Sequence, residues 1–219
     1  MKPSPWVRVS GSGRDKLLLG VFGGTFDPIH NGHLMVANEA AEHLGLDRIL
    51  FVPAGNPWLK DGTDITDSTH RLAMVHLGIA GNDRLEVSDV EMKRPGPSYT
   101  VDTLEDLAIK IGNGAPPYLL VGIDALSEFY RWQNPKRVLE LATVVGIRRP
   151  GFVELGREAM DRVQTGALQR VVLIKNTMTE ISSTEIRKSV GQGYPIRDLV
   201  PEPVAEYIYE HGLYGSSRE

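Results

Sequence analysis

Apolar residues are concentrated along the chain in six short runs. The runs lie at 17–22, 48–54, 84–90, 118–123, 142–147 and 170–175 (LLLGVF, RILFVPA, RLEVSDV, YLLVGI, ATVVGI and RVVLIK). Continuous apolar runs of this length are typical of strands that are buried on both faces of a parallel sheet. The pattern therefore predicts six short strands, and the folded part of the chain is expected to begin near Lys16.

The segments between these runs have a different period. Apolar residues stand three and four positions apart, which is the spacing of one buried helix face. This spacing predicts helices over 33–45, 68–80, 100–112 and 135–142. Because strands and helices alternate, the sequence predicts a Rossmann-like α/β fold, with a doubly wound, mainly parallel sheet and helices on both faces. Ligands of such a sheet bind beyond the carboxyl ends of its strands.

Length and composition agree with one such domain. The 219 residues contain no internal repeat, and no linker divides residues 16–219, so a single domain is expected there. Residues 1–15 are rich in Pro, Ser and Gly and have no period, which predicts a disordered extension. The chain has no cysteine, which excludes disulfides, thiolate metal sites and a cysteine nucleophile.

Charge and hydropathy narrow the range of partners. With 24 basic and 28 acidic residues the formal charge is −4, so a broad nucleic-acid surface is not expected. The sequence does not exclude a local basic pocket. The N-terminal segment lacks the apolar core of a signal peptide, and no apolar run reaches the roughly 18 residues of a membrane span. We therefore expect a cytoplasmic protein without nucleic-acid or membrane partners, and the sequence leaves homo-oligomerisation open.

The first loop, within GVFGGTFDPIHNGH (20–33), has the composition of a phosphate site. The residues expected to leave the carboxyl end of the first strand are Gly23, Gly24 and Thr25. A backbone without Cβ atoms lets a bulky anion approach, and amides at the start of the next helix attract negative charge. His30 and His33 stand at that helix start, so their imidazoles can donate hydrogen bonds to a phosphorus centre as it becomes five-coordinate.

The same residues also have structural interpretations. A Gly-Gly pair is a common turn, Asp27-Pro28 commonly starts a turn, and a lone histidine is often structural. A zinc site at His30-x-x-His33 is disfavoured, because a third ligand is not close in sequence and the spacing does not match HExxH. The combination of glycines, histidines and a helix start behind a strand favours the phosphate interpretation.

A second helix start lies at ISSTEIR (181–187), after the sixth predicted strand and before a short helix. Ser182 and Glu185 form an S-x-x-E capping box, which explains part of the motif without a ligand. The same helix start offers amides and hydroxyls to an anion, and Arg187 can donate a fork of hydrogen bonds to a phosphate. Capping and anion binding both stay open.

Three further residues have two interpretations each. Asp124 follows the end of the fourth strand, where a carboxylate suits ribose hydroxyls or caps a helix. Trp132 follows a short helix from the same strand end and is either a core residue or a platform for a ring. Arg71, near the start of the predicted helix 68–80, is either an ion-pair residue or a ligand.

The segment GTFDPIHNGH (24–33) resembles the T/H-x-G-H signature of the nucleotidylyltransferase superfamily, α/β enzymes in which ATP or CTP donates a nucleotidyl group. The motif is highly specific and matches neither GxGxxG nor a P-loop. ISSTEIR is similar to the second signature of that superfamily, whose Ser/Thr and Arg bind the triphosphate. The resemblance implies catalytic roles for His30, His33 and Arg187. It also implies an ATP site made of Gly23, Gly24, Thr25, Phe26, Gly122, Asp124, Ile181, Ser182, Ser183, Thr184 and Arg187.

Other fragments resemble the bacterial nicotinate-nucleotide adenylyltransferase family over about residues 17–214. These fragments follow one another in the same order as in that family. They are SYTVDTL (98–104), GIDAL (122–126), a Trp several residues later, RRPG (148–151) and VPEPVAEYIYEHGLY (200–214). In that family an aromatic residue stacks on the pyridine ring, and the SYT segment binds the carboxylate. The resemblance implies that Tyr99, Thr100 and Trp132 bind the mononucleotide.

The chain departs from this family in two places. Ile123 stands where the family often has Ala, and GNPWLKDG (55–62) replaces a stretch that usually carries Pro and His. Because Trp58 stands in that loop, the sequence does not determine which contacts the loop makes with the substrate. Lys60 can still bind a phosphate, and we expect it to be a substrate-binding residue. Because it is rich in turn-forming residues, segment 54–67 is expected to be a mobile lid.

The resemblance implies transfer of the adenylyl group of ATP to nicotinate mononucleotide, giving deamido-NAD and pyrophosphate in NAD biosynthesis. Attack on the α-phosphorus is expected to be in line and without a covalent intermediate, with Mg²⁺ on the triphosphate and no metal ligand from the protein. Two alternatives stay open: another adenylyltransferase, such as the pantetheine-phosphate enzyme, and a non-enzymatic nucleotide sensor on the same fold. SYTVDTL and Trp132 weigh against the first alternative, and His30, His33 and Arg187 weigh against the second.

Overall fold

The computed structural model describes residues 16–57, 65–112, 114–148, 160–175 and 181–215. Its strands are β1 (Leu19–Gly24), β2 (Arg48–Pro53), β3 (Leu85–Val87), β4 (Tyr118–Gly122), β5 (Thr143–Arg148) and β6 (Val171–Lys175). They form one sheet in the order β3-β2-β1-β4-β5-β6, and every neighbouring pair is parallel. The predicted parallel α/β sheet is confirmed, and each predicted strand overlaps an observed one.

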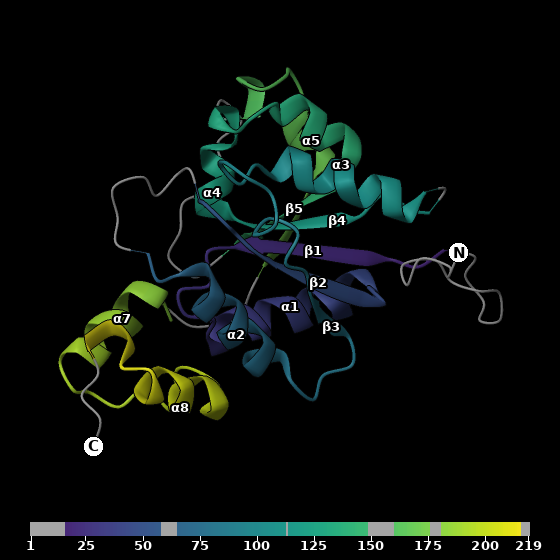
Figure 1. Cartoon of the computed structure of the whole chain (residues 1–219). Coiled ribbons are helices and arrows are strands. Elements are labelled where there is room, and N and C mark those ends of the chain that lie inside the picture. The colour runs from purple at the N-terminus through teal and green to yellow at the C-terminus, as the bar shows by residue number, and fades with distance from the viewer. Residues whose placement is uncertain (1–15, 58–64, 113, 149–159, 176–180, 216–219) are drawn as a thin grey trace.

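Helices cover both faces of this sheet (Figure 1). One face carries α3 (Thr100–Ile111), α4 (Ile123–Ser127) and α5 (Pro135–Leu141). The other face carries α1 (Asn31–Leu44), α2 (Ser68–Ile79), α7 (Ser183–Gly191) and α8 (Glu202–Glu210). Short 3₁₀ turns lie at η2 (Phe129–Arg131), η3 (Ala167–Arg170) and η4 (Leu213–Gly215). The four helices predicted from periodicity are confirmed to within two residues at each end.

Two hydrophobic cores lie on either side of the sheet. Successive side chains of a strand point to opposite faces, so neighbouring residues of β1 enter different cores. Val21 belongs to the same core as Leu104 of α3, whereas Phe22 belongs to the core that contains Met74 of α2 and Val204 of α8. The central strand β1 is therefore buried on both faces, as its continuous apolar run predicts.

The carboxyl ends of β1 and β4 mark the point where the chain changes direction across the sheet. β1 pairs with β2 on one side and with β4 on the other, so successive connections leave toward opposite edges. Parallel sheets bind ligands in the crevice at such a point. Gly24 and Gly122 end the two strands there.

Two elements differ from the sequence-based prediction. The third strand is confined to Leu85–Val87, because the chain then turns away from β2 and the N–H of Met92 donates to the carbonyl of Asp89 at 3.0 Å. Helix α8 was not predicted; it begins with two prolines nearby and buries Val204, Ala205 and Ile208. The predicted extension 1–15 and residues 58–64 of the predicted lid lie outside the described residues.

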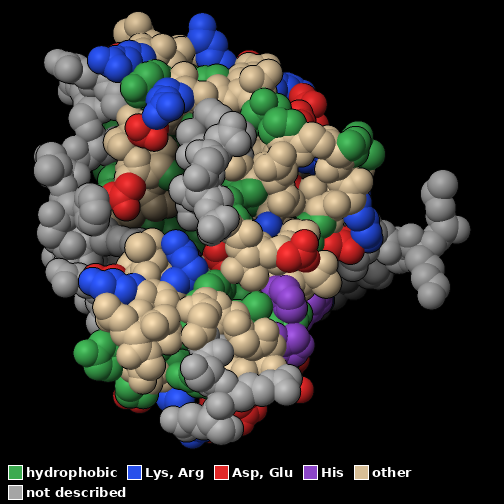
Figure 2. Space-filling model, turned by 60° about the vertical axis from the view of Figure 1, so that its left-hand side comes forward, with side chains coloured by type: hydrophobic (Ala, Val, Ile, Leu, Met, Phe, Trp, Pro, Cys, Tyr) green, Lys and Arg blue, Asp and Glu red, His purple; other side chains and the backbone are tan. Residues whose placement is uncertain are grey.

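On the face shown in Figure 2, basic and acidic side chains are interspersed. This distribution agrees with the near balance of 24 basic and 28 acidic residues. Within the described ranges, none of the helices combines the length and the apolar character that crossing a membrane requires.

Candidate active site

The loop that follows β1 is anchored by an aromatic side chain. Phe26 has a left-handed backbone (φ 49°), and its ring is buried. The ring lies edge-on to Phe22, with centroids 5.6 Å apart, and 5.5 Å from Phe51 of β2. Phe26 was predicted to contact ATP; because its ring belongs to the core, only its backbone can take that role.

The two histidines of the motif form one unit at the start of α1. Their rings stack with centroids 3.7 Å apart and planes 24° from parallel. The backbone N–H of His30 donates to Nδ1 of His33 at 3.2 Å. A neutral His33 therefore carries its proton on Nε2, where it can donate a hydrogen bond. The ring of His33 also lies edge-on to Phe26, at 5.0 Å between centroids, so the core holds its orientation.

Gly32 makes this stacking possible. A Cβ atom at Gly32 would lie 3.0 Å from Nδ1 and 3.1 Å from Cε1 of His30. A side chain at that position would therefore make the His30 ring shift by a few tenths of an ångström. The glycine of the H-x-G-H motif therefore leaves room for the close approach of the buried imidazole.

The start of α1 offers fewer amides to an anion than the sequence predicts. The main-chain N–H of Asn31 donates to the carbonyl of Leu199 at 2.9 Å, and its side-chain amide donates to Asp198 at 3.0 Å. These contacts tie α1 to the turn before α8. The prediction that amides at this helix start face a ligand is therefore corrected for Asn31.

Helix α7 docks directly on the loop after β1. The Ser183 hydroxyl donates to the carbonyl of Pro28 at 3.0 Å, and Nη1 of Arg187 donates to the carbonyl of Asp27 at 2.8 Å. The predicted cap is confirmed, since Ser182 Oγ accepts from the N–H of Glu185 at 3.2 Å. Thr184 is exposed on the first turn. The structure thus brings the two predicted motifs together at one edge of the sheet.

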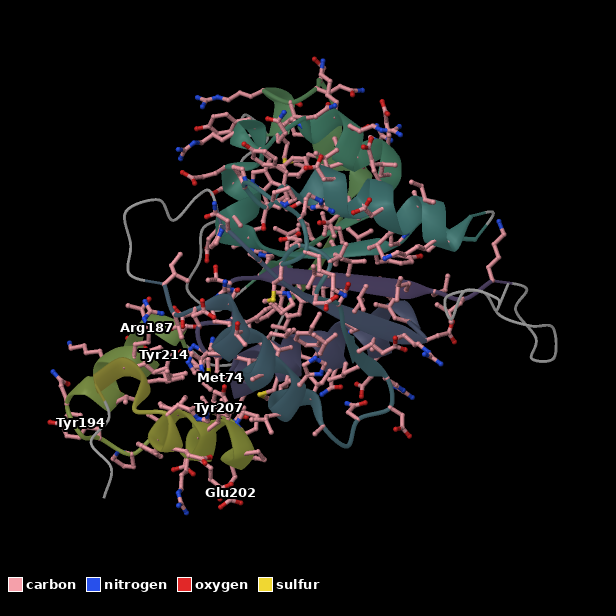
Figure 3. The ribbon with its side chains drawn as sticks, in the orientation of Figure 1. Met74, Arg187, Tyr194, Glu202, Tyr207 and Tyr214 are labelled. Atoms are coloured by element: carbon pink, nitrogen blue, oxygen red, sulfur yellow. The ribbon has the colours of Figure 1, made fainter. Side chains whose placement is uncertain are left out.

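Asp27 is a second anchor of this loop, and sequence reasoning did not identify it. Its buried carboxylate accepts from the Tyr214 hydroxyl at 2.7 Å and from the N–H of Thr66 at 3.2 Å. Figure 3 shows Arg187, Tyr214 and Met74 next to one another, although they come from α7, η4 and α2. The first loop is therefore held by segments from three distant parts of the chain.

Arg71 has neither of the two roles considered from the sequence. Its side chain is 1% exposed and donates to three main-chain carbonyls. They belong to Thr66 (2.9 Å), Thr25 (2.8 Å) and Gly55 (3.2 Å). Burial lowers the pKa of the Arg71 guanidinium, and the charge of nearby Asp27 raises it in part. Arg71 therefore joins the loop after β1 to the loop after β2.

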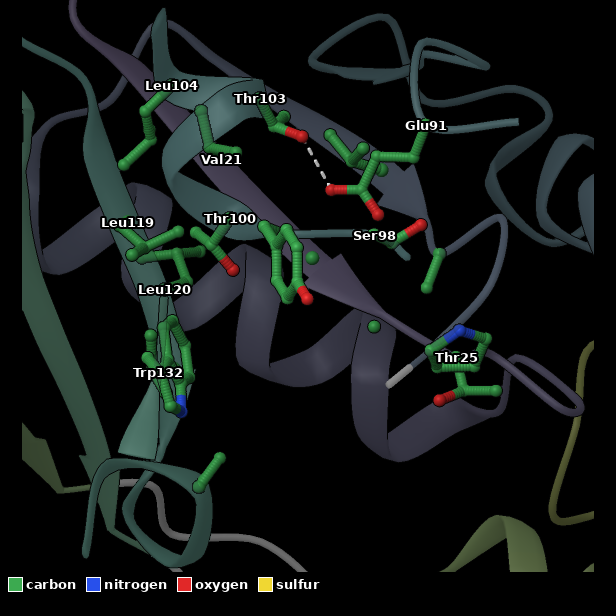
Figure 4. A pocket seen from close by; sticks show the side chains of 18 of the residues that line it. Val21, Thr25, Glu91, Ser98, Thr100, Thr103, Leu104, Leu119, Leu120 and Trp132 are labelled. Atoms are coloured by element: carbon green, nitrogen blue, oxygen red, sulfur yellow. Dashed lines mark hydrogen bonds between the residues drawn. The ribbon is translucent and has the colours of Figure 1, made fainter. Parts of the chain in front are cut away.

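A cavity of about 250 Å³ opens beside the end of β1, on the α3 side of the sheet. Its lining includes Tyr99, Thr100 and Trp132, the three residues predicted to bind the mononucleotide. Figure 4 labels Thr100 and Trp132 among the lining residues. Gly23, Gly24 and Thr25 also line this cavity, whereas His30, His33 and Arg187 do not. The sequence motifs that were predicted to bind different substrates thus meet at the carboxyl end of β1.

Trp132 belongs both to the core and to the cavity. Its ring lies edge-on to Phe129, with centroids 5.0 Å apart, and it packs against the core on the α3 side. The indole Nε1 is buried and has no hydrogen-bond partner in the part of the chain that is described. The two interpretations of Trp132 are therefore compatible, because the same ring packs on Phe129 and lines the cavity.

A buried polar pair closes the cavity on the α3 side, and the sequence pattern did not reveal it. Glu91 is 8% exposed and accepts from the hydroxyl of Thr103 at 2.6 Å. Burial raises the pKa of the Glu91 carboxyl, because water no longer stabilises the charged form. Glu91 lies in a loop without periodicity, so no sequence signal distinguishes it from a surface acid.

The remaining predicted residues divide into two groups. Gly122 lines the cavity and is the N-cap of α4, whereas Asp124 is exposed in the first turn of that helix and does not line the cavity. The alternative that Asp124 caps the helix is therefore wrong. Lys60 and Trp58 lie outside the described residues, as do 149–151 of RRPG.

A metal site was not expected from the sequence. In the described ranges, no group of three or more His, Asp or Glu side chains could hold a metal ion. His30 and His33 are stacked ring to ring. The stacked geometry gives no support to the zinc alternative.

Comparisons with known proteins show the family of the chain. A family model described as cytidylyltransferase-like matches residues 21–189. A protein of Roseiflexus sp. named "Probable nicotinate-nucleotide adenylyltransferase" is 44% identical over 196 residues, which are 90% of this chain and 97% of that protein. A protein of the same name from Dehalococcoides mccartyi is 39% identical over 198 residues, with the same two coverages of 90% and 97%.

Solved structures share the fold. The nicotinic acid mononucleotide adenylyltransferase of Plasmodium falciparum, complexed with NaAD, has a TM-score of 0.74 and 20% sequence identity. The same enzyme complexed with APC has a TM-score of 0.73 and 22% identity. Each match covers 93% of this chain and 100% of the other chain. At this identity the structural likeness supports the fold alone.

The fold and the paired motifs define a nucleotidyltransferase of the cytidylyltransferase-like class. Within that class, the chain belongs to the nicotinate-nucleotide adenylyltransferase family, because the 44% identity extends over 90% of its length. The family, the fold class and the enzyme class predicted from the sequence are confirmed.

Proposed function

We propose that the chain transfers the adenylyl group of ATP to nicotinate mononucleotide, forming deamido-NAD and pyrophosphate. The observation that carries this proposal is the junction at the end of β1. There Gly24 and Thr25, which lead to the stacked His30 and His33 and to the loop on which α7 docks, line a cavity together with Tyr99, Thr100 and Trp132. One side suits phosphates and the other suits an aromatic ring.

The cavity suits the pyridine end of the mononucleotide. Its lining is mainly apolar, with the Trp132 ring and the polar Tyr99 and Thr100 at the start of α3. Stacking on an aromatic ring contributes about 1–3 kcal/mol per base in nucleotide sites. We assign the ring contact to Trp132, and the carboxylate of the substrate to hydrogen-bond donors of Tyr99 and Thr100.

The chemistry is a single displacement at phosphorus. A 5′-phosphate oxygen of the mononucleotide forms a bond to the α-phosphorus, and the bond between that phosphorus and the α–β bridging oxygen breaks. Pyrophosphate leaves with the bridging oxygen. The protein supplies positioning and charge stabilisation, which dominate catalysis of phosphoryl and nucleotidyl transfer.

The histidine pair is assigned to the reacting phosphates. With Nδ1 of His33 accepting the His30 N–H, the Nε2–H of a neutral His33 is available as a donor. Gly24 and Thr25 present their backbone beside the same phosphates. A preorganised donor of this kind stabilises charge that develops in the transition state, without forming a bond to phosphorus.

The start of α7 is assigned to the departing pyrophosphate. Arg187 uses Nη1 to hold the Asp27 carbonyl, and its guanidinium carries further N–H groups for phosphate oxygens. The Ser183 hydroxyl donates to Pro28, so we assign ligand contacts of Ser183 to its main-chain amide. Thr184, exposed in the first turn, contributes an amide and a hydroxyl, and Ile181 and Ser182 contribute backbone near the adenine.

Two polar groups and one ion complete the proposal. Asp124, exposed at the end of β4, suits the ribose hydroxyls, and Lys60 is proposed as a phosphate ligand from the sequence alone. Mg²⁺ would be held by oxygens of the ATP triphosphate, because the described residues offer no cluster of protein ligands. Bound there, the ion neutralises charge on the leaving group.

The purified chain should be incubated with ATP, Mg²⁺ and one acceptor at a time: nicotinate mononucleotide, nicotinamide mononucleotide or phosphopantetheine. We expect deamido-NAD, identified by mass, and pyrophosphate in equal amounts, with nicotinate mononucleotide as the preferred acceptor. A product with phosphopantetheine alone would favour the other adenylyltransferase. ATP binding without pyrophosphate release for any acceptor would favour the nucleotide sensor.

A further inference from the structure

Glu91 is the one carboxylic acid among the described residues that line the cavity, and that lining contains no Lys or Arg. It lies on the loop between β3 and α3 and is 8% exposed. A buried carboxyl costs free energy unless several donors compensate for the lost water. Its presence beside a site for an anionic substrate therefore requires a reason.

Hydrogen-bond donors converge on Glu91 from two sides (Figure 4). Thr103 of α3 donates its hydroxyl to Oε1 at 2.6 Å, and Thr103 in turn accepts from Nη1 of Arg94 at 3.3 Å. A hydrogen bond from the Ser98 side chain lowers the pKa of Glu91 and opposes the larger effect of burial, which raises it. Glu91 thus serves as the shared acceptor of two buried hydroxyls.

The direction of the Ser98 hydrogen bond follows from its other partners. Ser98 Oγ accepts from the N–H of Gly55 at 2.9 Å and from the N–H of Asn56 at 3.1 Å. A hydroxyl oxygen has two lone pairs and one proton, so both acceptor positions are taken. The single proton must be donated, and the carboxylate of Glu91 is the acceptor that receives it.

This chain of hydrogen bonds joins two walls of the cavity. Gly55 and Asn56 begin the segment after β2, and Ser98 directly precedes Tyr99 and Thr100. The N–H of Ser98 also donates to the carbonyl of Asn56 at 2.8 Å. The two backbones touch as well, since a Cβ at Gly55 would lie 2.4 Å from the carbonyl oxygen of Glu91.

We propose that Glu91 is a positioning residue for the mononucleotide: as the acceptor of the Ser98 hydroxyl it fixes the segment after β2 against the start of α3. The proposal rests on the proposed function, because it takes the cavity as the mononucleotide site. Glu91 acts through Ser98 and Thr103, and its role is separate from the phosphate groups held near His33 and Arg187.

A carboxylate performs this role better than an amide of the same shape. Gln at position 91 has one acceptor oxygen and one NH₂ group. If the NH₂ faces Ser98, whose lone pairs are both used, the Ser98 proton loses its acceptor. If the NH₂ faces Thr103, the Thr103 proton loses its acceptor and Ser98 keeps only a neutral amide oxygen, which is a weaker acceptor than a carboxylate. The Ser98 link between the two walls weakens in both orientations.

The test compares Glu91→Gln, Ser98→Ala and the double variant with the wild-type chain in steady-state kinetics with ATP and nicotinate mononucleotide. The control is Leu107→Ala, a buried position on α3 that does not line the cavity. We expect each single variant to raise the KM for the mononucleotide by about tenfold or more, with the KM for ATP changed less than about twofold. The double variant should lose no more than the larger single variant, because both break one link.

Several outcomes would overturn the proposal. One is a mononucleotide KM that stays unchanged or falls in Glu91→Gln, as expected if the only effect of Glu91 were repulsion of the substrate carboxylate. Another is multiplication of the two single effects in the double variant. A third is an equal rise of the KM for ATP and the KM for the mononucleotide in Glu91→Gln, if Leu107→Ala shows the same rise at a similar loss of Tm. If Glu91→Gln does not fold, the kinetics of Ser98→Ala alone decide the proposal. A wild-type chain that is inactive with nicotinate mononucleotide would instead refute the proposed function.

Discussion

Tyr214 donates its hydroxyl to Oδ1 of Asp27 at 2.7 Å, across 187 positions of the sequence. The same carboxylate accepts from the N–H of Thr66, and the main-chain carbonyl of Asp27 accepts from Arg187. The C-terminal segment is therefore part of the support of the loop that carries His30 and His33. Asp27 joins this segment to α7 and to the start of α2.

Tyr214→Phe should lower the free energy of unfolding by about 1.5–3 kcal/mol, because a partly buried hydrogen bond to a charged group is lost. It should also lower kcat for adenylyl transfer without changing the KM for the mononucleotide, since the loop after β1 loosens while the cavity stays intact. Chemical denaturation and steady-state kinetics measure the two effects. Tyr194→Phe, at a side chain that is 61% exposed, is the matched control.

The stability difference between the wild-type chain and Tyr214→Phe should also depend on pH. Burial raises the pKa of the Tyr214 hydroxyl above its usual value, and the charge of Asp27 raises it further. A raised pKa in the folded state means that the contribution is fully present below the unfolded value of about 10 and is lost as pH rises above it. A difference that grows between pH 9 and pH 11 would contradict this assignment.

His33→Ala should leave the fold intact and lower kcat by roughly 10²-fold or more, the scale of losing one preorganised donor. The measurement is steady-state kinetics with circular dichroism as a folding control. His43→Ala, at an exposed histidine near the end of the same helix, should keep wild-type kcat. A folded His33→Ala variant with nearly normal kcat would remove His33 from the mechanism.

Two substitutions in α7 should separate the ligand from the cap. Arg187→Ala should weaken ATP binding and catalysis, because a fork of donors to phosphate and the contact with Asp27 are both lost. Ser182→Ala should mainly cost about 1 kcal/mol of stability, because Ser182 Oγ caps the helix through the N–H of Glu185. The affinity for ATP, measured by calorimetry, and the Tm of each variant distinguish the two roles. A loss of Tm without a loss of ATP affinity in Arg187→Ala would support a purely structural role.

Trp132→Ala should raise the KM for the mononucleotide by roughly 5- to 150-fold and leave the KM for ATP nearly unchanged. The range follows from about 1–3 kcal/mol for stacking on a base. Preference for the acid over the amide should largely persist, since we assign it to Tyr99 and Thr100. Tyr130→Ala, at an exposed aromatic residue two positions away, is the control. Parallel losses of Tm and of affinity for both substrates would leave Trp132 as a core residue only.

Much of the fold could be predicted from the sequence because the signals are local. The six strands appear as short apolar runs, and the helices α1, α2, α3 and α5 appear as a period of three to four residues. The two motifs around 24–33 and 181–187 are also local, and only their meeting at the end of β1 depends on the topology. That meeting follows from a parallel sheet, in which the carboxyl ends of strands share one edge.

The supports of the site could not be predicted in the same way. Tyr214 and Asp27, Ser98 and Gly55, and Glu91 and Thr103 are distant in sequence, and no period or motif marks their pairing. Arg71 resembles a surface cation in the sequence, yet it is buried against three carbonyls. Such contacts arise from tertiary packing, which determines which polar groups lose water together.

Direct transfer from ATP to the mononucleotide is tested by the configuration at phosphorus. The Nδ1 of His33 accepts a backbone N–H, so its Nε2–H is a donor, and we assign neither histidine as a nucleophile. The measurement uses ATP with a chiral sulfur-substituted α-phosphate, and nicotinate mononucleotide as acceptor. One in-line displacement predicts inversion at the phosphorus of the dinucleotide product. Retention would contradict direct transfer, because it requires two displacements and a nucleotidyl group carried by the protein.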